Sequence, residues 1–441
     1  MAALLYLAVI VVGVFSALLY TPVKQEAIIM GLFRPLESWQ NVHGIENRVI
    51  ENTVACEDIH YHESSGMLYT ACMRDIEKAA GWFPGAGTLA HPENPAYGGL
   101  VVIDPTTLKS QELTLLNFDP SQPFVPHGVS LYTPPSDPNI VYMFVINHVP
   151  NPLWTETAPE QPKAASRVEL FVHTVGSVTA SHVRSISHPL IRTPNDLLAL
   201  SENEFLVTND HYYREGLLRL VEDMVRRPWS DVTHVQIHEN NVTAAVLLAP
   251  LSTPNGLAWG PDGQVLLGDA AGGSISFGSL APRPDQNPNS SPLQLTVSHS
   301  IPSDSIVDNP SYFSDPYAGV SDGPDYSGYL IPGMGRGLDF AASITDGTGS
   351  ALMPSMVWYL PARAGISSST TTSSSSAGEE KETPRILFSD DGSAMRGVTT
   401  AALVAIDPKA NGGKREGWLF MTGLVAPNIV ASRIDFAAAL A

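Results

Sequence analysis

Short apolar runs bounded by polar turn residues recur along the chain, and this pattern predicts β-strands rather than long helices. Residues 191–213 show the pattern most clearly. An apolar run at 197–200 is followed by a polar turn and by a second run, rich in β-forming residues, at 205–208. We therefore predict a β-hairpin with two clusters of oxygen-bearing side chains, Asn195-Asp196 and Asn209-Asp210, at the same end of its strands.

A polar pair that opens an apolar run recurs at irregular intervals along the chain. The pairs are Glu57-Asp58, His127-Gly128, Asn195-Asp196, Asn255-Gly256, Asp308-Asn309 and, as a weaker copy, Arg396-Gly397. Candidate second strands follow at 142–148, 205–210 and 265–269, and candidate third strands at 99–104, 168–172 and 217–220, with 402–407 resembling 99–104. Six units of about four short strands predict an all-β fold, a six-bladed β-propeller over residues 51–441.

Several segments lie outside this repeat. Helical pieces are predicted near residues 76–80 and 215–227, and the second of these overlaps the candidate strand at 217–220. A run of Ser and Thr within residues 365–383 predicts a disordered loop between blade elements. Residues 23–50 form a connector of mixed polarity that precedes the propeller.

The N-terminal segment is hydrophobic. Residues 2–20 carry no charge, and their length is close to the ~20 residues needed to span a bilayer. We predict a hydrophobic helix that serves as a signal anchor over residues 1–22 and associates with a membrane, with a cleaved signal peptide as the alternative. Lys24 and Arg34 follow the segment and argue against a lumenal location. Glycosylation sequons at Asn241 and Asn289 favour the secretory pathway, with a membrane-anchored or secreted glycoprotein as the product.

Composition narrows the classes of function. The net charge is −20, which disfavours binding to nucleic acid and would suit a cation. The 35 Gly and 36 Pro residues indicate many turns, in agreement with short strands. Cys56 and Cys72 flank a predicted turn at 63–66 and are the two cysteines of the chain. Both a cross-strand disulfide and two buried thiols are compatible with this spacing.

The polar pairs suggest a metal site. Equivalent positions of the blades surround one central channel in a propeller, so the pairs that open equivalent strands would converge at one mouth of it. They supply oxygen ligands from Glu57, Asp58, Asn195, Asp196, Asn255, Asp308 and Asn309. Carboxylate and amide oxygens suit Ca²⁺, whereas Zn²⁺ favours His and Cys. Turn preference alone explains one or two such pairs, but five in register point to calcium in a central tunnel.

Two histidines lie beside this predicted metal site. His127 opens one strand and His148 ends the adjacent strand, so a hairpin would bring them together. Neighbouring imidazoles near a metal-bound carbonyl can act as a general base and the group that orients it. The alternative for each histidine alone is a hydrogen-bonded packing residue.

At these residues the sequence resembles the paraoxonase/arylesterase family. The matching segments, in the family's order, are Glu57-Asp58, residues 126–130, residues 145–148, Asn195-Asp196, residues 208–212, Asn255-Gly256 and residues 307–309. The resemblance implies a propeller with two calcium ions in its tunnel. The catalytic ion would be held by Glu57, Asn195, Asn255, Asp308 and Asn309, and the deeper ion by Asp58, Asp196 and the carbonyl of Val129. His127 and His148 match the family's histidine dyad.

The chain differs from the family pattern in three ways, and its Pro- and Ser-rich inserts are one of them. The family's disulfide between its N- and C-terminal regions has no counterpart, since no cysteine follows Cys72. A further active-site histidine of the fifth blade is also missing, because the nearest match, residues 330–334, contains none.

These observations predict a calcium-dependent hydrolase of carboxylic esters, a lactonase or arylesterase that acts on a small ester or lactone. Ca²⁺ would polarise the carbonyl, His127 would deprotonate water, His148 would orient His127, and Glu57 could share the role of base. One alternative is a gluconolactonase-like or strictosidine-synthase-like enzyme on the same fold. Another is a non-catalytic, calcium-stabilised propeller that binds a partner.

Overall fold

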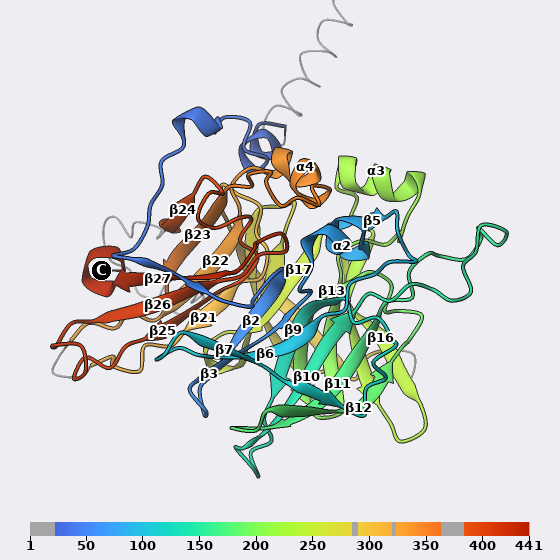
Figure 1. The fold of residues 1–441 in the computed structure, drawn as a ribbon, viewed down its shortest axis with the longest axis horizontal. Coiled ribbons are helices and arrows are strands. Elements are labelled where there is room, and N and C mark those ends of the chain that lie inside the picture. Colours follow the sequence, from blue (N-terminus) through green and yellow to red (C-terminus); the bar gives the residue numbers. More distant parts are fainter. Residues whose placement is uncertain (1–22, 285–289, 320–322, 363–382, 441) are drawn as a thin grey trace, which may run out of the picture.

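The computed structural model describes residues 23–284, 290–319, 323–362 and 383–440, and over these residues the chain is an all-β propeller (Figure 1). In this part of the chain the strands form six sheets of four or five strands and one two-stranded sheet. The first strands of the six large sheets contact one another in a closed cycle, β2–β9–β13–β17–β21–β25 and back to β2. The predicted six-bladed β-propeller is therefore confirmed.

Each blade is an antiparallel sheet whose first strand lines the channel. Blade 1 contains β2 (Cys56–His62), β3 (Met67–Cys72), β6 (Gly99–Asp104) and β7 (Lys109–Glu112); blade 2 contains β9 (Pro126–Tyr132), β10 (Ile140–Asn147), β11 (Arg167–Thr174) and β12 (Thr179–Ile186), with β8 (Thr114–Leu116) at its edge. Blade 3 contains β13 (Pro194–Ser201), β14 (Glu204–Asn209), β15 (Ser230–Ile237) and β16 (Val242–Leu251). Blade 4 contains β17 (Pro254–Trp259), β18 (Gln264–Asp269), β19 (Ser274–Pro282) and β20 (Leu293–Pro302). Blade 5 contains β21 (Ser311–Phe313), β22 (Gly328–Met334), β23 (Ser355–Pro361) and β24 (Arg385–Asp390); blade 6 contains β25 (Ala401–Ala405), β26 (Glu416–Met421), β27 (Ile429–Asp435) and β1 (Asn47–Ile50).

Blade 6 closes the ring with strands from both ends of the chain. β1, which lies in the range predicted as a connector, pairs antiparallel with β27, with Asn47 opposite Ser432. Side chains reinforce the closure, since the Arg433 guanidinium lies 2.6 Å from the Glu416 carboxylate and 3.6 Å from that of Glu46. Hydrogen bonds and ion pairs thus join the first and last strands.

Three helices, α2 (Ile76–Gly81), α3 (Leu217–Val225) and α4 (Phe340–Ile344), lie at one end of the propeller, whereas the C-terminal helix α5 (Phe436–Ala439) lies at its side, next to β27 (Figure 1). The predicted helix near 76–80 is α2, and Asp75 caps it by accepting a hydrogen bond from the Lys78 amide at 3.1 Å. Residues 217–220, a candidate third strand, instead begin α3, in agreement with the helical reading of 215–227. The third strand of blade 3 is β15. Leu217–Val225 forms a helix because its apolar residues follow a 3.6-residue period, and Arg219 pairs with Asp223 one turn later.

Two predicted segments fall outside the described residues. The predicted signal-anchor helix over 1–22 is one, and the Ser/Thr-rich loop at 365–383 lies almost wholly outside as well. Of the helices in the part of the chain that the structure covers, none is long and apolar enough to cross a bilayer.

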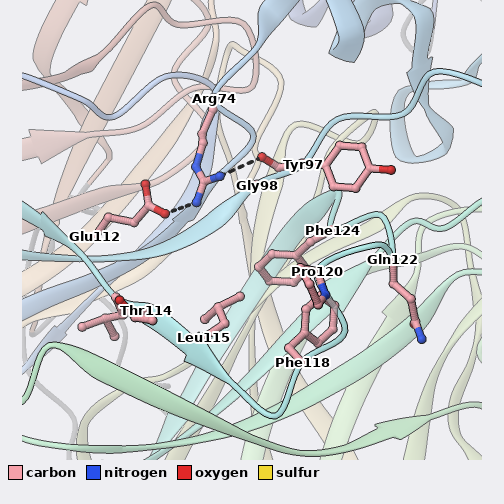
Figure 2. A pocket seen from close by; sticks show the side chains of 11 residues that line it. Arg74, Tyr97, Gly98, Glu112, Thr114, Leu115, Phe118, Pro120, Gln122 and Phe124 are labelled. Carbon is pink, nitrogen blue, oxygen red and sulfur yellow. Dashed lines mark hydrogen bonds and ion pairs between the residues drawn. The ribbon is translucent and has the colours of Figure 1, made fainter.

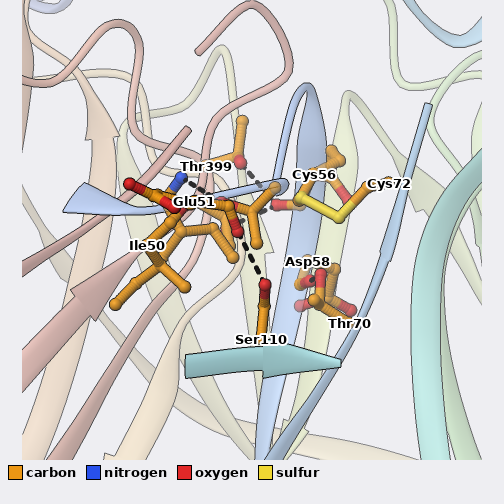
Figure 3. Close-up of a disulfide and its surroundings, with 12 residues drawn as sticks. Ile50, Glu51, Cys56, Asp58, Thr70, Cys72, Ser110 and Thr399 are labelled. Atoms are coloured by element: carbon orange, nitrogen blue, oxygen red, sulfur yellow. Dashed lines mark hydrogen bonds between the residues drawn. A yellow bond between two sulfur atoms is a disulfide. The ribbon is translucent and has the colours of Figure 1, made fainter. Parts of the chain in front are cut away.

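A disulfide between Cys56 and Cys72 joins β2 to β3, which decides between the two alternatives for this pair (Figure 3). The two residues are directly opposite in the register of the antiparallel strands, and both are buried. Figure 3 shows the bond beside Asp58 and Thr70, and the Thr70 hydroxyl donates to the carbonyl of Asp58. The bond therefore fixes the start of the strand that carries Glu57 and Asp58.

Replacing both cysteines with alanine is expected to lower the free energy of unfolding by about 3 kcal/mol, because the bond closes a loop of 16 residues in the unfolded chain. Urea titrations followed by circular dichroism would measure the change. The wild-type protein in excess dithiothreitol is the control and should unfold near the midpoint of the double variant. Equal midpoints of wild type and variant without reductant would contradict the expectation.

Candidate metal centre and active site

β-Bulges at the start of the inner strands aim the predicted site residues at the channel. The pairing register of β2, β13 and β17 with their second strands shifts at the polar pair, between Cys56 and Ile59, Pro194 and Leu197, and Pro254 and Leu257. A bulge frees a residue from the ladder and redirects its side chain. Because the bulge recurs in three blades, polar pairs from different blades meet at the axis.

The five predicted ligands of the catalytic ion lie together, and we call them the outer group. These are Glu57, Asn195, Asn255, Asp308 and Asn309, all buried. The Asn309 amide donates to Glu57 Oε1 at 2.7 Å. Four other oxygens of the group are buried without a hydrogen-bond partner: Glu57 Oε2, Asn195 Oδ1, Asn255 Oδ1 and Asn309 Oδ1. Buried polar atoms are normally satisfied, so four orphaned oxygens from four blades fit a cation with oxygen ligands.

The electrostatics of the outer group also fit a cation. Burial raises the pKa of Glu57 well above its usual value, and neighbouring carboxylates, Asp308 first, raise it further. Burial and then the charge of Asp58 raise the pKa of Asp308 to about 8. A divalent cation among these groups would reverse both shifts by stabilising the charged carboxylates. Across the described ranges, no cluster of three or more His, Cys, Asp or Glu side chains is placed to hold a metal; the outer group has two carboxylates, and its other oxygens are amides.

The residues predicted to hold a deeper ion, Asp58, Val129 and Asp196, form an inner group one position further along the strands. The Val129 amide donates to Asp58 Oδ2 at 2.9 Å, and the Leu257 amide donates to Asp196 Oδ2 at 2.6 Å. His60 also belongs to this group, because its Nε2 lies 2.9 Å from Asp58 Oδ2. These contacts join blades 1, 2, 3 and 4 below the outer group.

Charge and hydrogen bonding set the pKa values within the inner group. Burial alone would raise the pKa of Asp58, but the charge and the hydrogen bond of His60 outweigh it, and the pKa is lowered. Burial disfavours the charged form of His60, yet the attraction of Asp58 raises its pKa to about 9. Burial and then Asp58 raise the pKa of Asp196 well above its usual value.

His127 and His148 meet, as predicted. The distance from His127 Nδ1 to His148 Nε2 is 3.0 Å, and His148 Nδ1 lies 2.8 Å from Ser166 Oγ. Both rings are buried, and Phe83 packs against both edge-on, with centroid distances of 4.8 and 5.3 Å. His127 Nε2 is 3.9 Å from Glu57 Oε1, so the dyad abuts the outer group. Burial lowers the pKa of His127 to about 4 and that of His148 well below its usual value.

A cavity of about 640 Å³ opens above these residues. Its floor contains His127 together with Glu57, Asn195, Asn255 and Asp308 of the outer group. Its walls are largely apolar, formed among others by Met30, Phe83, Leu89, Leu220, Ile306, Met334 and Phe340. An apolar chamber with a few convergent polar groups is the usual form of a small-molecule site.

The structure adds pocket residues that the sequence reasoning did not assign. Asp210 and His211, which follow β14, line the cavity, and His211 bridges Asp210 at 3.1 Å and Asp223 of α3 at 2.7 Å. The sequence does indicate a role for Asp210, because the predicted hairpin brings it to the same end as Asn195-Asp196. The short hairpin β4 (Trp82–Phe83) and β5 (Thr88–Leu89) forms another wall, and Trp82 Nε1 donates to the His148 carbonyl at 2.8 Å. Strands of two residues leave no periodic pattern to detect.

Two further cavities contain neither the outer group nor the dyad. One, of about 520 Å³, lies between the outer strand of blade 1 and β8, where the Arg74 guanidinium spans from the Tyr97 carbonyl to the Glu112 carboxylate (Figure 2). The other, of about 840 Å³, lies at the opposite end of the channel. It is lined by the later residues of the inner strands, among them His60, Tyr61, Trp259 and Tyr312.

Fold and site together define a β-propeller with a buried, oxygen-rich cluster on its axis and a paired-histidine dyad beside it. Residues 79–269 match the family model described as arylesterase. This range includes His127, His148, Asn195 and Asn255. The resemblance to the paraoxonase/arylesterase family is thereby confirmed.

Two serum paraoxonases illustrate the relationship. Serum paraoxonase/arylesterase 2 of Rattus norvegicus is 28% identical over 241 residues, which cover 54% of this chain and 58% of the relative. Serum paraoxonase/arylesterase 1 of Homo sapiens is 32% identical over 161 residues, or 36% of this chain and 39% of the relative. The matched region thus spans less than two thirds of these relatives. Among solved structures, a gluconolactonase from Xanthomonas campestris covers 90% of this chain and 98% of its own at 9% identity, with a TM-score of 0.37, which supports no conclusion about the site.

Proposed function

We propose that the chain is a calcium-dependent hydrolase of carboxylic esters, with lactones and aryl esters as its substrate class. The observation that supports this most directly is the set of four orphaned buried oxygens beside the histidine dyad, on the floor of an apolar cavity. The confirmed family resemblance supports it independently.

The outer group would hold the ion. Ca²⁺ favours six to eight oxygen ligands, and Glu57, Asp308 and the three asparagines supply carboxylate and amide oxygens. When bound, the ion would supply positive charge that polarises an ester carbonyl and stabilises the oxyanion. The apolar walls would hold the acyl chain or aromatic ring and limit the access of water to the reacting carbonyl.

The dyad would supply the base. His148 Nδ1–H donating to Ser166 leaves His148 Nε2 to accept from His127 Nδ1–H. His127 Nε2, which lies 3.9 Å from Glu57 Oε1, would then be the nitrogen that takes a proton from water. Because burial holds the pKa of His127 at about 4, the imidazole is neutral at neutral pH, the state in which a general base can accept a proton. Glu57 lies close enough to share this role.

We also place the chain in the secretory pathway, membrane-anchored or secreted. The Cys56–Cys72 disulfide supports this, because such bonds persist in oxidising compartments. Asn241 of the first sequon is exposed at the turn before β16 and accessible to glycosylation, whereas Asn289 lies outside the described residues.

A panel of γ- and δ-lactones, sugar lactones and phenyl acetate, assayed with Ca²⁺ and with EDTA, tests the proposal. We expect hydrolysis in calcium, loss of activity in EDTA, recovery on re-addition of calcium, and a lower melting temperature in EDTA because the ion binds the folded state. If EDTA changed neither the activity nor the melting temperature, the proposed dependence on calcium would be wrong. Calcium-dependent stability without hydrolysis would favour the non-catalytic propeller, which the missing fifth-blade histidine supports. Hydrolysis of sugar lactones alone would favour a gluconolactonase-like enzyme.

A further inference from the structure

The inner group differs from the outer group in how its oxygens are used. In the outer group four buried oxygens have no hydrogen-bond partner and are therefore available to bind a cation. Among the described residues, no carboxylate oxygen of Asp58 or Asp196 is buried without a hydrogen-bond partner. The two groups therefore present different chemistry to a metal ion, although both carry two carboxylates.

The carboxylate of Asp58 is fully engaged by the protein. Its Oδ1 accepts from the Ile59 amide at 2.8 Å and from the Thr400 hydroxyl at 3.0 Å. Its Oδ2 accepts from the Val129 amide at 2.9 Å and lies 2.9 Å from His60 Nε2. Two oxygens offer about four lone-pair positions, and four donors from blades 1, 2 and 6 are directed at them. The single hydroxyl proton of Thr400 is shared with the Glu57 carbonyl, 3.1 Å away.

Asp196 is held by two backbone amides. Leu197 donates to its Oδ1 at 2.7 Å, and Leu257 of the next blade donates to its Oδ2 at 2.6 Å. Both inner carboxylates thus fasten neighbouring inner strands to each other. Asp196 keeps lone pairs that an ion could use, but an ion that also bound Asp58 would have to share or displace the hydrogen bonds of that carboxylate.

His60 lies between the inner group and the cavity at the opposite end of the channel. Its imidazole is bonded to Asp58 on one side and lines the 840 Å³ cavity at the opposite end of the channel on the other. It therefore lies between Asp58 and that cavity, where a water ligand from the cavity would otherwise reach an ion bound to Asp58. Imidazole is a poor ligand for Ca²⁺, which prefers oxygen.

We propose that the His60 imidazole takes the place of the deeper calcium ion, so that this propeller holds a single calcium ion, in the outer group. The inference rests on the proposed calcium function of the outer group and departs from the two ions that the family resemblance implies. The N–H of His60 donates a hydrogen bond to the buried Asp58 carboxylate, which a metal ion would otherwise stabilise. The inner group then joins neighbouring blades through hydrogen bonds alone.

Calcium bound per chain, counted by equilibrium dialysis against 1 mM Ca²⁺ and elemental analysis, tests the inference. We expect one ion in the wild type, one in His60→Gln, whose amide keeps an N–H for Asp58, and two in His60→Ala, which opens Asp58 to a metal. Asp308→Asn should reduce the wild-type count, whereas Asp58→Asn should leave it at one.

Each other count has a distinct meaning. Two ions in the wild type would overturn the inference and leave the proposed function intact. No ion in the wild type would overturn both the single-ion count and the calcium part of the proposed function. One ion in folded His60→Ala would show that His60 is not what excludes the second ion. Loss of the ion in Asp58→Asn but not in Asp308→Asn would place the ion in the inner group, also against the inference.

Discussion

His127→Gln is expected to lower kcat/KM for lactones and phenyl acetate by about 10²–10⁴-fold, the usual contribution of a general base. Glutamine keeps a polar side chain of similar length but cannot accept the proton at Nε2. The structure places His127 3.0 Å from His148 and on the floor of the cavity, so the loss should be in the chemical step. Initial rates over a range of substrate concentration would measure it, and kcat should fall more than KM rises.

Measuring the calcium bound by His127→Gln distinguishes loss of the general base from loss of the metal ion. His127→Gln should bind calcium as the wild type does, because the histidine is not part of the outer group. His173→Gln is a matched control, since His173 is also a buried histidine of blade 2 but is bonded to the Thr179 carbonyl, away from the cavity. Wild-type rates in His127→Gln would refute the assignment of the dyad.

Glu57→Gln and Asp308→Asn should each weaken calcium binding by about 100-fold or more, because each removes one of the two carboxylates from a buried cation site. At low calcium both variants should be nearly inactive and should melt earlier than the wild type. Calcium titrations followed by activity and by melting temperature would measure the shift in affinity.

Saturating calcium distinguishes the roles of the two residues. Asp308→Asn should regain most of its activity once the ion is bound, since it would act only as a ligand. Glu57→Gln should remain slow if Glu57 shares the role of base with His127, from which it is 3.9 Å away. Unchanged calcium affinity in both variants would contradict the outer group as a metal centre.

The polar pairs made the site predictable from the sequence. Four of the pairs lie within the first residues of β2, β9, β13 and β17, and Asp308-Asn309 lies just before β21, whereas Arg396-Gly397 lies further ahead of β25. The ring symmetry of the blades brings the equivalent positions together on the axis. The sequence also placed His127 and His148 in one hairpin, and the structure brings them into contact. These predictions depended on local periodicity and on repetition, which the sequence carries directly.

Features that depend on long-range packing were not predictable. Residues 217–220 contain enough leucine to suit a strand or a helix, and the ion pair of Arg219 with Asp223 belongs to the helix that forms. A single histidine in a strand, His60, gives no signal until its distance to Asp58 is known. The cysteine pair permitted two states until the register of β2 and β3 set the residues opposite each other.

Blade 6 combines β1 with β25, β26 and β27, and this pairing limits how early the ring can close during synthesis. Asn47 pairs with Ser432, so the ring stays open until nearly the whole chain has left the ribosome, on the order of a minute after synthesis begins. The outer group shares this delay, because the bond from Asn309 to Glu57 joins residues 252 positions apart. Such non-local contacts slow folding, and local blades form before the ring that unites them. The proposed catalytic centre would thus be among the last parts of the molecule to assemble, so a chain truncated before blade 6 could fold single blades yet would lack the site.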